Sequence, residues 1–200
     1  MCAGKAMKVL IVGEGGREHA LAWKISQSPR VSQVYCAPGN GGTDEVGINI
    51  PLKATDIQGL RGFASRERIE LIVVGPELSL TLGLVDEFEK DGLRAFGPNK
   101  QAAEIEGSKA FAKEVMSYAG IPTAAHVVVD NSTEAKQALE KIGAPVAVKA
   151  DGLAGGKGVV ICPNIEEAWA AVCAMMVEGK LGEAGRRLIL EELLEGEEVS

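Results

Sequence analysis

Four short apolar segments in the first hundred residues each stop at glycine or proline, and this pattern narrows the possible folds more than any other feature. They are residues 8–12, 33–37, 71–74 and 93–96. Helical spacing of apolar residues occupies the intervals between them, at 18–26, 57–68 and 82–91. Strands that are apolar throughout are typical of a parallel sheet covered by helices on both faces. The sequence therefore predicts an α/β domain built on a parallel sheet.

The glycine-rich stops after these strands predict where a ligand would bind. They lie at 13–16, 38–42, 75–76 and 97–98. In a parallel sheet the carboxyl ends of the strands meet at one edge, and ligands bind there. We therefore expect the four loops to form a single rim.

The second half of the chain repeats the alternation after a helical stretch over residues 100–119, which Gly120 and Pro122 end. Strands are expected at 125–129, 146–149, 159–162 and 188–192. Helices are expected at 133–142 and 165–178. A domain boundary is predicted near residues 104–122. The last residues, 194–200, have the pattern of another strand about to begin, which suggests a truncated fold.

The charge and composition exclude several classes of partner. The net charge is −7 and no basic block is present, which argues against duplex nucleic acid or an anionic membrane as partner. Aromatic residues make up only 4%, so a surface that stacks nucleic-acid bases is not expected. The four cysteines form no C-x-x-C pair, which favours free thiols in a reducing, cytoplasmic setting. No apolar run approaches the roughly 18 residues of a membrane span.

The first rim loop, Gly13 to His19, follows a strand and opens a helix, which favours an anion near its backbone N–H groups. Gly15, Gly16 and Arg17 are the candidate donors. A dinucleotide site is disfavoured because Glu18 stands where the third glycine of G-x-G-x-x-G belongs, and no acid follows the second strand. A tight turn without a ligand remains the alternative.

Two further rim residues carry polar groups. Asn40 lies in the glycine-rich stop of the second strand, and Glu77 follows the third. A carboxylate at this position suits an amine or sugar hydroxyls, whereas an exposed loop glutamate is the alternative.

The segment 146–160 carries the strongest single signal. Lys149 ends an apolar strand, a loop with four glycines and Lys157 follows, and another strand comes next. Such a loop suits a polyphosphate, with backbone N–H groups and two ammonium groups around it. It is not a Walker A loop, because Asp151 and Gly158 stand where that pattern needs glycine and serine or threonine. A glycine-rich hairpin with solvated lysines is the alternative.

Taken together, six ordered motifs resemble the N-terminal half of the glycinamide ribonucleotide synthetase family, also called phosphoribosylamine–glycine ligases, of the ATP-grasp superfamily. They are G-G-R-E-H-A-L at 15–21, A-P-G-N at 37–40, V-G-P-E at 74–77, G-S-K-A-F at 107–111, V-K-A-D-G-L-A at 148–154 and G-K-G-V at 156–159. The resemblance covers nearly the whole chain.

The resemblance implies a Rossmann-like, parallel-sheet domain that precedes an α+β ATP-grasp lid domain, which is truncated at its C-terminus. The expected parts are an α/β substrate-binding domain at 1–104, a helical connector at 105–122, a lid subdomain at 123–188 and the start of a further ATP-grasp subdomain at 189–200. The implied reaction joins glycine to 5-phosphoribosylamine with ATP, through a glycyl phosphate, in purine synthesis. Magnesium or manganese would accompany ATP, with ligands expected beyond Ser200 and none within this chain.

The resemblance also implies residue roles. For ATP these are Lys109 and Lys149 at the phosphates or the adenine, Lys157 with Gly155, Gly156 and Gly158 over the phosphates, the backbone of Glu191 and Leu194 at the adenine, and Glu197 or Glu198 at the ribose. For phosphoribosylamine they are Gly15, Gly16, Arg17, Asn40 and Glu77. No catalytic residue is assigned.

Departures from the family pattern leave alternatives open. Gly155 replaces a more usual alanine, and Leu78-Ser79 replaces a more usual Ala-Pro. Because the family continues well past residue 200, the chain alone is expected to be incomplete for catalysis. The alternatives are another ATP-grasp carboxylate–amine ligase or carboxylase, and a non-catalytic nucleotide-binding fragment. A dinucleotide-dependent dehydrogenase is disfavoured by the missing acid.

Overall fold

The strand that organises the first part of the chain is β1 (Met7–Gly13), whose residues 9–12 have no exposed surface. A computed structural model describes residues 6–197 and 199, in two compact units of which the first ends at Ala103 and the second begins at Glu104. In the first unit β1 pairs in parallel with β2 (Val31–Pro38) on one side and β4 (Leu71–Val74) on the other.

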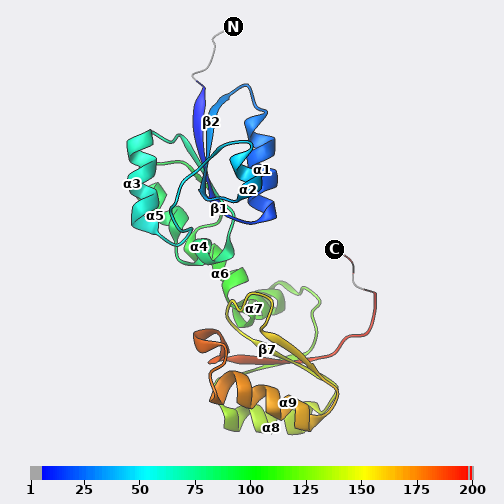
Figure 1. Ribbon diagram of the computed structural model, residues 1–200. Coiled ribbons are helices and arrows are strands. Elements are labelled where there is room, and N and C mark those ends of the chain that lie inside the picture. The colour runs from blue at the N-terminus through cyan, green and yellow to red at the C-terminus, as the bar shows by residue number, and fades with distance from the viewer. Residues whose placement is uncertain (1–5, 198, 200) are drawn as a thin grey trace. The chain divides into compact units, whose positions relative to one another are not determined.

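The first unit is a three-layered α/β fold (Figure 1). Its five-stranded sheet has the order β3-β2-β1-β4-β5, with β3 at Ile48–Asn49 and β5 at Ala95–Phe96, and every pair is parallel. Val9 and Ile11 pack toward α1 (Gly16–Ser26), whereas Leu10 and Val12 face α3 (Ile57–Glu67) and α5 (Leu84–Lys90). This confirms the predicted parallel sheet with helices on both faces.

The loops after three neighbouring strands meet at the carboxyl edge of this sheet. The Gly39 N–H donates to the Gly13 carbonyl, and the Gly75 N–H donates to the Val12 carbonyl, both at 3.1 Å. The glycine-rich stops after β1, β2 and β4 therefore form a continuous rim.

Two details of the first unit differ from the prediction. The helix expected over residues 82–91 is confirmed as α5, but the separate helix α4 (Glu77–Thr81), which Gly83 at φ 87° divides from α5, was not predicted. A positive φ of this kind interrupts an α-helix and favours glycine. The short β3 and the one-turn α2 (Gly41–Asp44) were not predicted, because a few residues carry too little periodicity to identify an element.

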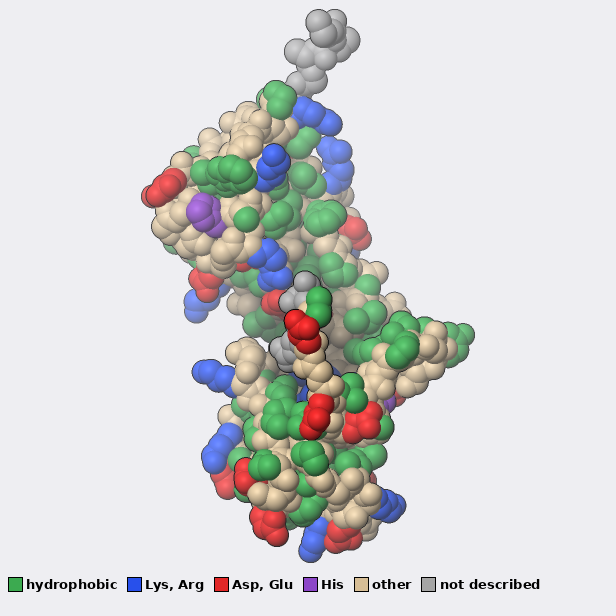
Figure 2. Space-filling view, turned by 90° about the vertical axis from the view of Figure 1, so that its right-hand side faces the viewer, with side chains coloured by type: hydrophobic (Ala, Val, Ile, Leu, Met, Phe, Trp, Pro, Cys, Tyr) green, Lys and Arg blue, Asp and Glu red, His purple; other side chains and the backbone are tan. Residues whose placement is uncertain are grey.

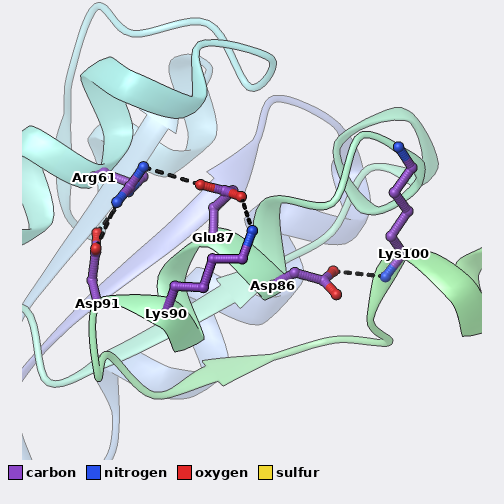
Figure 3. A network of polar contacts seen from close by, with 6 residues as sticks. All are labelled: Arg61, Asp86, Glu87, Lys90, Asp91 and Lys100. Carbon is purple, nitrogen blue, oxygen red and sulfur yellow. Dashed lines mark hydrogen bonds and ion pairs between the residues drawn. The ribbon is translucent and has the colours of Figure 1, made fainter.

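A polar network fastens α3 to α5 on the outer side of the first unit (Figure 3). Arg61 of α3 donates from Nε and Nη2 to the two carboxylate oxygens of Asp91, both at 2.6 Å, and from Nη1 to Glu87 at 3.0 Å. Lys90 pairs with the other oxygen of Glu87 at 2.5 Å. A bidentate guanidinium–carboxylate pair fixes the relative orientation of the two helices.

The second unit is an antiparallel sheet with helices on its two faces (Figure 1). Its order is β6-β9-β7-β8, with β6 at His126–Val129, β9 at Leu188–Glu192, β7 at Val146–Ala150 and β8 at Val159–Cys162. The helices α8 (Ser132–Ile142) and α9 (Ile165–Val172) cover one face and bury an apolar core there, while α7 (Lys109–Ala119) lies over the other.

One helix prediction in the second half is wrong in extent. The stretch 100–119 is not one helix: α6 (Lys100–Gly107) ends before Ser108, whose hydroxyl accepts a hydrogen bond from the Phe111 N–H and begins α7. Serine favours this capping position over a helix interior. The helical stretch expected over 165–178 is present, as α9 followed directly by a π-helical turn, Cys173–Val177.

The surface of the second unit mixes charges of both signs. In Figure 2 lysine or arginine and glutamate or aspartate side chains alternate along its lower edge, over the α8 and α9 end of the unit. No helix in the described part of the chain is long and apolar enough to cross a bilayer.

Candidate functional site

The loop between β1 and α1 is arranged around the carboxylate of Glu18, which is only 3% exposed. Its Oε2 accepts a hydrogen bond from the Gly15 N–H at 2.7 Å, and its Oε1 accepts one from Arg17 Nε at 3.0 Å. A Cβ on Gly13 or Gly15 would stand 2.5 or 2.8 Å from Glu18, and one on Gly75 closer still. These glycines therefore make room for a buried carboxylate, a role that the motif did not reveal.

Asn40 joins the first two rim loops. Its Oδ1 accepts hydrogen bonds from the backbone N–H groups of Gly42 at 2.8 Å and Thr43 at 3.0 Å, which caps α2. Its Nδ2 donates to the carbonyl of Glu14 at 2.8 Å. The Asn40 side chain thus holds the loop after β1 at a fixed distance from the loop after β2.

Arg17 and Glu77 form an ion pair across the rim, with 3.2 Å between Nη2 and Oε1. Both side chains are about half exposed, which leaves them accessible to a ligand. The hydrogen bond to Glu18, followed by the contact with Glu77, raises the pKa of Arg17. The backbone N–H of Glu77 itself, assisted by Arg17, holds the pKa of the Glu77 carboxyl below its ordinary value. The rim therefore presents one fixed cation beside one fixed anion.

A cavity of about 530 Å³ opens at this rim. It is lined by Gly13, Glu14, Gly15, Glu18, Pro38, Lys53, Ala54, Thr55, Pro76, Leu78 and Ser79. Of the predicted substrate residues only Gly15 lines it directly. Gly16, Arg17, Asn40 and Glu77 belong to the loops that frame it. Lys53 and Thr55 were missed because they follow β3, a strand too short to be recognised from the sequence.

The second group of predicted residues lies on the face of the second sheet that α7 covers. Glu191 in β9 stands opposite Ala147 in β7, and Lys149 stands opposite Ile189. Alternate residues of a strand share a face, so Lys149 and Glu191 point to the same side. Val146, Val148 and Leu190 point to the other side, into the core against α8 and α9.

On that face Glu191 pairs with two lysines. Lys149 Nζ lies 2.7 Å from Glu191 Oε2, and Lys113 Nζ of α7 lies 3.1 Å from Oε1. Burial alone would raise the pKa of Glu191, but the hydrogen bonds from Lys149 and Lys113 outweigh it and hold that pKa below its ordinary value. Lys113 was not predicted, because mid-helix position and residue type do not distinguish it from a solvated lysine.

The glycine-rich loop is anchored where it begins. The Asp151 carboxylate accepts hydrogen bonds from the Ser108 hydroxyl at 2.9 Å and the Ala110 N–H at 2.8 Å, which ties the loop to the start of α7. Lys109 Nζ donates to the carbonyls of Asp151 at 3.4 Å and Gly152 at 3.3 Å. The predicted cation Lys109 thus stands at the base of the predicted phosphate loop.

The rest of this loop is open to solvent. Gly155 and Gly156 have φ of 55° and 79°, and with Lys157 they are exposed. Gly158 is buried, and its carbonyl accepts a hydrogen bond from the Ala150 N–H at 2.7 Å, which closes the loop at its base. A loop fixed at both ends with an exposed lysine between them suits a ligand that enters from solvent.

Apolar side chains lie beside the lysines of this face. Val159 and Ile161 in β8 stand opposite Lys149 and Ala147, and they are 45% and 51% exposed. After β9 the chain continues through Leu194 and Glu197, both exposed. Glu198, the other predicted ribose ligand, lies outside the described residues.

The predicted site residues therefore form two groups, one in each unit, and their roles stay predictions. Among residues 6–197 and 199 no group of three or more histidine, cysteine, aspartate or glutamate side chains could hold a metal ion.

Comparison with known proteins identifies the relatives of both units. The sequence model of the phosphoribosylglycinamide synthetase N domain matches residues 7–106, and that of the ATP-grasp (A) domain of the same synthetase matches residues 107–200. The chain belongs to the phosphoribosylglycinamide synthetase family. The resemblance in the six motifs is confirmed, and the two family domains adjoin close to the boundary between the structural units.

Among family members, the phosphoribosylamine–glycine ligase of Allochromatium vinosum is 56% identical over 196 residues, which are 97% of this chain and 46% of that protein. The crystal structure of phosphoribosylamine–glycine ligase from Thermotoga maritima has 33% identity and a TM-score of 0.74, over 95% of this chain and 44% of that one. The chain thus spans about half the length of the relatives it matches.

A biotin carboxylase domain from Hydrogenobacter thermophilus, solved with MgADP and bicarbonate, has a TM-score of 0.78 with 24% identity over 94% of this chain and 44% of that one. Identity at this level shows that the fold is shared and nothing more. The phosphoribosylglycinamide synthetase family therefore describes this chain more closely than the carboxylases do.

Proposed function

We propose that the chain forms the phosphoribosylamine- and ATP-binding parts of a phosphoribosylamine–glycine ligase. The reaction would join glycine to 5-phosphoribosylamine and give glycinamide ribonucleotide, ADP and phosphate. The observation that carries the proposal is the placement of Lys149, Glu191 and Lys113 beside a glycine-rich loop in a unit that matches the family's ATP-grasp domain.

Two steps would lead to the amide. The glycine carboxylate attacks the γ-phosphorus of ATP, so that glycyl phosphate forms and ADP leaves. The amine of phosphoribosylamine then attacks the glycyl carbonyl, phosphate leaves and the amine loses a proton. The first step is required because a carboxylate has no adequate leaving group, and the acyl phosphate must be kept from water.

In the second unit we assign ATP to the face that carries Lys149. The ammonium groups of Lys149, Lys109 and Lys157 and the N–H groups of Gly155, Gly156 and Gly158 would bind the phosphates. The exposed Val159 and Ile161 offer an apolar wall for the adenine, beside the backbone groups of Glu191 and Leu194. Glu197 or Glu198 would bind the ribose. Magnesium or manganese would accompany ATP, and we assign it no ligand among the described residues.

In the first unit we assign phosphoribosylamine to the cavity at the rim. Its volume of about 530 Å³ lies within the roughly 300–1,000 Å³ of small-molecule sites. Arg17, with N–H groups of Gly15 and Gly16, would bind the phosphate, and Glu77 would accept hydrogen bonds from the amine or the sugar hydroxyls. Asn40, whose side chain is committed to the loops, would hold the frame. A cytoplasmic location would keep the cysteines reduced, and in the described part Cys36, Cys162 and Cys173 are free thiols.

The test is a hybrid ligase in which this chain replaces the matching N-terminal part of the Allochromatium vinosum enzyme. ADP release is measured with glycine and phosphoribosylamine, together and each alone. The proposal expects ADP release that needs both substrates. A folded hybrid ligase that binds ATP without substrate-dependent ADP release would contradict it and favour a non-catalytic nucleotide-binding fragment.

A further inference from the structure

Glu191 is shared by two lysines of unequal exposure. The side chains of Glu191 and Lys113 are 11% and 9% exposed, whereas the Lys149 side chain is 26% exposed. Two ammonium groups face one carboxylate, so the cluster carries one positive charge in excess. A buried excess charge of this kind favours an anionic ligand.

Lys113 is held where it is by more than the carboxylate. Its Nζ also donates to the Thr123 hydroxyl at 2.6 Å and approaches the Ala124 carbonyl at 3.5 Å. These contacts come from the segment between α7 and β6, in which Thr123 is exposed and Ala124 is buried. Lys149, by contrast, is in the strand that leads directly into the glycine-rich loop. Of the two lysines, Lys149 is therefore the one that a ligand can reach.

The pairing has an energetic consequence for binding. If Lys149 were the only partner of Glu191, a ligand that bound the Lys149 ammonium group in place of Glu191 would leave a buried carboxylate without a counterion. Breaking a buried ion pair in this way is strongly unfavourable. With Lys113 in place, Glu191 keeps a partner when Lys149 turns to a ligand.

We propose that Lys113 is a positioning residue, the resident counterion of Glu191, which leaves the charge of Lys149 available to the polyphosphate of a nucleotide. This inference rests on the proposed binding of ATP to the second unit. It assigns Lys113 no contact with the nucleotide, and its effect passes through Glu191 and Lys149.

The experiment is an ATP titration of the full 200-residue chain, ¹⁵N-labelled and with magnesium chloride, followed by the amide signals of residues 146–162. Four proteins are compared: the unchanged chain, Lys113→Met, Lys113→Met with Glu191→Gln, and Lys180→Met. Lys180 is the matched control, because it pairs with Glu178 at 2.8 Å in the same unit with both side chains exposed.

We expect Lys113→Met to raise the dissociation constant for ATP by about tenfold or more, because it removes the excess charge of a poorly solvated cluster. Adding Glu191→Gln removes the competing carboxylate and should return the constant to within about threefold of the unchanged chain. Lys180→Met should leave it unaltered. A merely structural role of Lys113 would predict no rescue, since the second change restores no lost packing.

Wild-type affinity in Lys113→Met, or a double variant as weak as the single one, would overturn the inference while ATP binding stands. Absence of binding by the unchanged chain would instead overturn the proposed function, and this inference with it. If Lys113→Met fails to fold, Glu191→Gln is compared with the double variant. If the double variant then binds ATP more than about tenfold more weakly than Glu191→Gln does, the counterion role is contradicted, because Lys113 would matter without the carboxylate charge.

Discussion

The Glu18 carboxylate accepts a hydrogen bond from the Gly15 N–H at 2.7 Å, three residues earlier in the chain. This contact closes the N-terminus of α1 by the reciprocal half of a capping box, because the side chain at the third helical position bonds the backbone at the cap. It also explains why the loop is rich in glycine, since the carboxylate fills the space that side chains would need.

Gly75→Ala is therefore expected to destabilise the chain. The new Cβ would overlap the buried Glu18 carboxylate, which cannot move without losing its bonds to Gly15 and Arg17. Overpacking of this kind costs about 1–3 kcal/mol, to be measured by urea unfolding followed by circular dichroism. Gly62→Ala is the matched control, because its Cβ meets nothing and lies in α3, where alanine should stabilise by about 1 kcal/mol. Equal stability of the two variants would contradict the assigned role of Glu18.

Arg17→Met is expected to raise KM for phosphoribosylamine in the hybrid ligase without raising KM for ATP. Loss of a charge-assisted contact at the rim should raise KM for phosphoribosylamine by about 10- to 100-fold. KM for ATP should stay within about twofold, because Arg17 belongs to the first unit. Steady-state kinetics with each substrate varied in turn provides the measurement. A parallel rise in both constants would argue against a separate phosphoribosylamine site.

Lys149→Met is expected to affect the use of ATP and not that of phosphoribosylamine. KM for ATP in the hybrid ligase should rise by about tenfold or more, since a charged group is removed from the proposed phosphate site while Lys113 still pairs with Glu191. KM for phosphoribosylamine should change little. Lys180→Met serves again as the control, and an unchanged KM for ATP in Lys149→Met would refute the phosphate role.

The pH dependence of stability should report on Glu191. Its pKa is lower in the folded chain, so it stabilises the fold above the ordinary glutamate pKa of about 4.3, and this contribution is lost as the pH falls through the folded value. Glu191→Gln should therefore be less stable than the unchanged chain at pH 7, and the difference should shrink below about pH 4.

The measurement is urea unfolding followed by Trp169 fluorescence, with Trp23 replaced by phenylalanine in both proteins. Trp169 packs against the core of the second unit, whereas Trp23 belongs to the first. If the difference in free energy of unfolding between Glu191→Gln and the protein with Glu191 stays constant from pH 7 to pH 3, the Glu191 charge does not stabilise the fold.

The sequence predicted the described strands other than the short β3, and the rim after β1, β2 and β4, because apolar runs ending in glycine depend on local chemistry alone. It did not predict the break at Ser108, since the apolar stripe continues across it and only the capping hydroxyl distinguishes the residue. Nor could it predict the burial of Glu18 and Lys113. Charged residues are usually exposed. Lys113 is buried because Glu191 approaches it from a distant part of the chain. Glu18 is bound by its neighbours Gly15 and Arg17 but is covered by the loop at Gly75, which the local sequence does not reveal.

Asp151 and Gly158 limit how the glycine-rich loop can travel. Asp151 is bound to the start of α7, and Gly158 is bound to Ala150 of β7. Any movement of the loop must therefore occur between these two anchored ends. Only the ammonium group of Lys157 would move with the loop, while those of Lys109 in α7 and Lys149 in β7 would keep their positions.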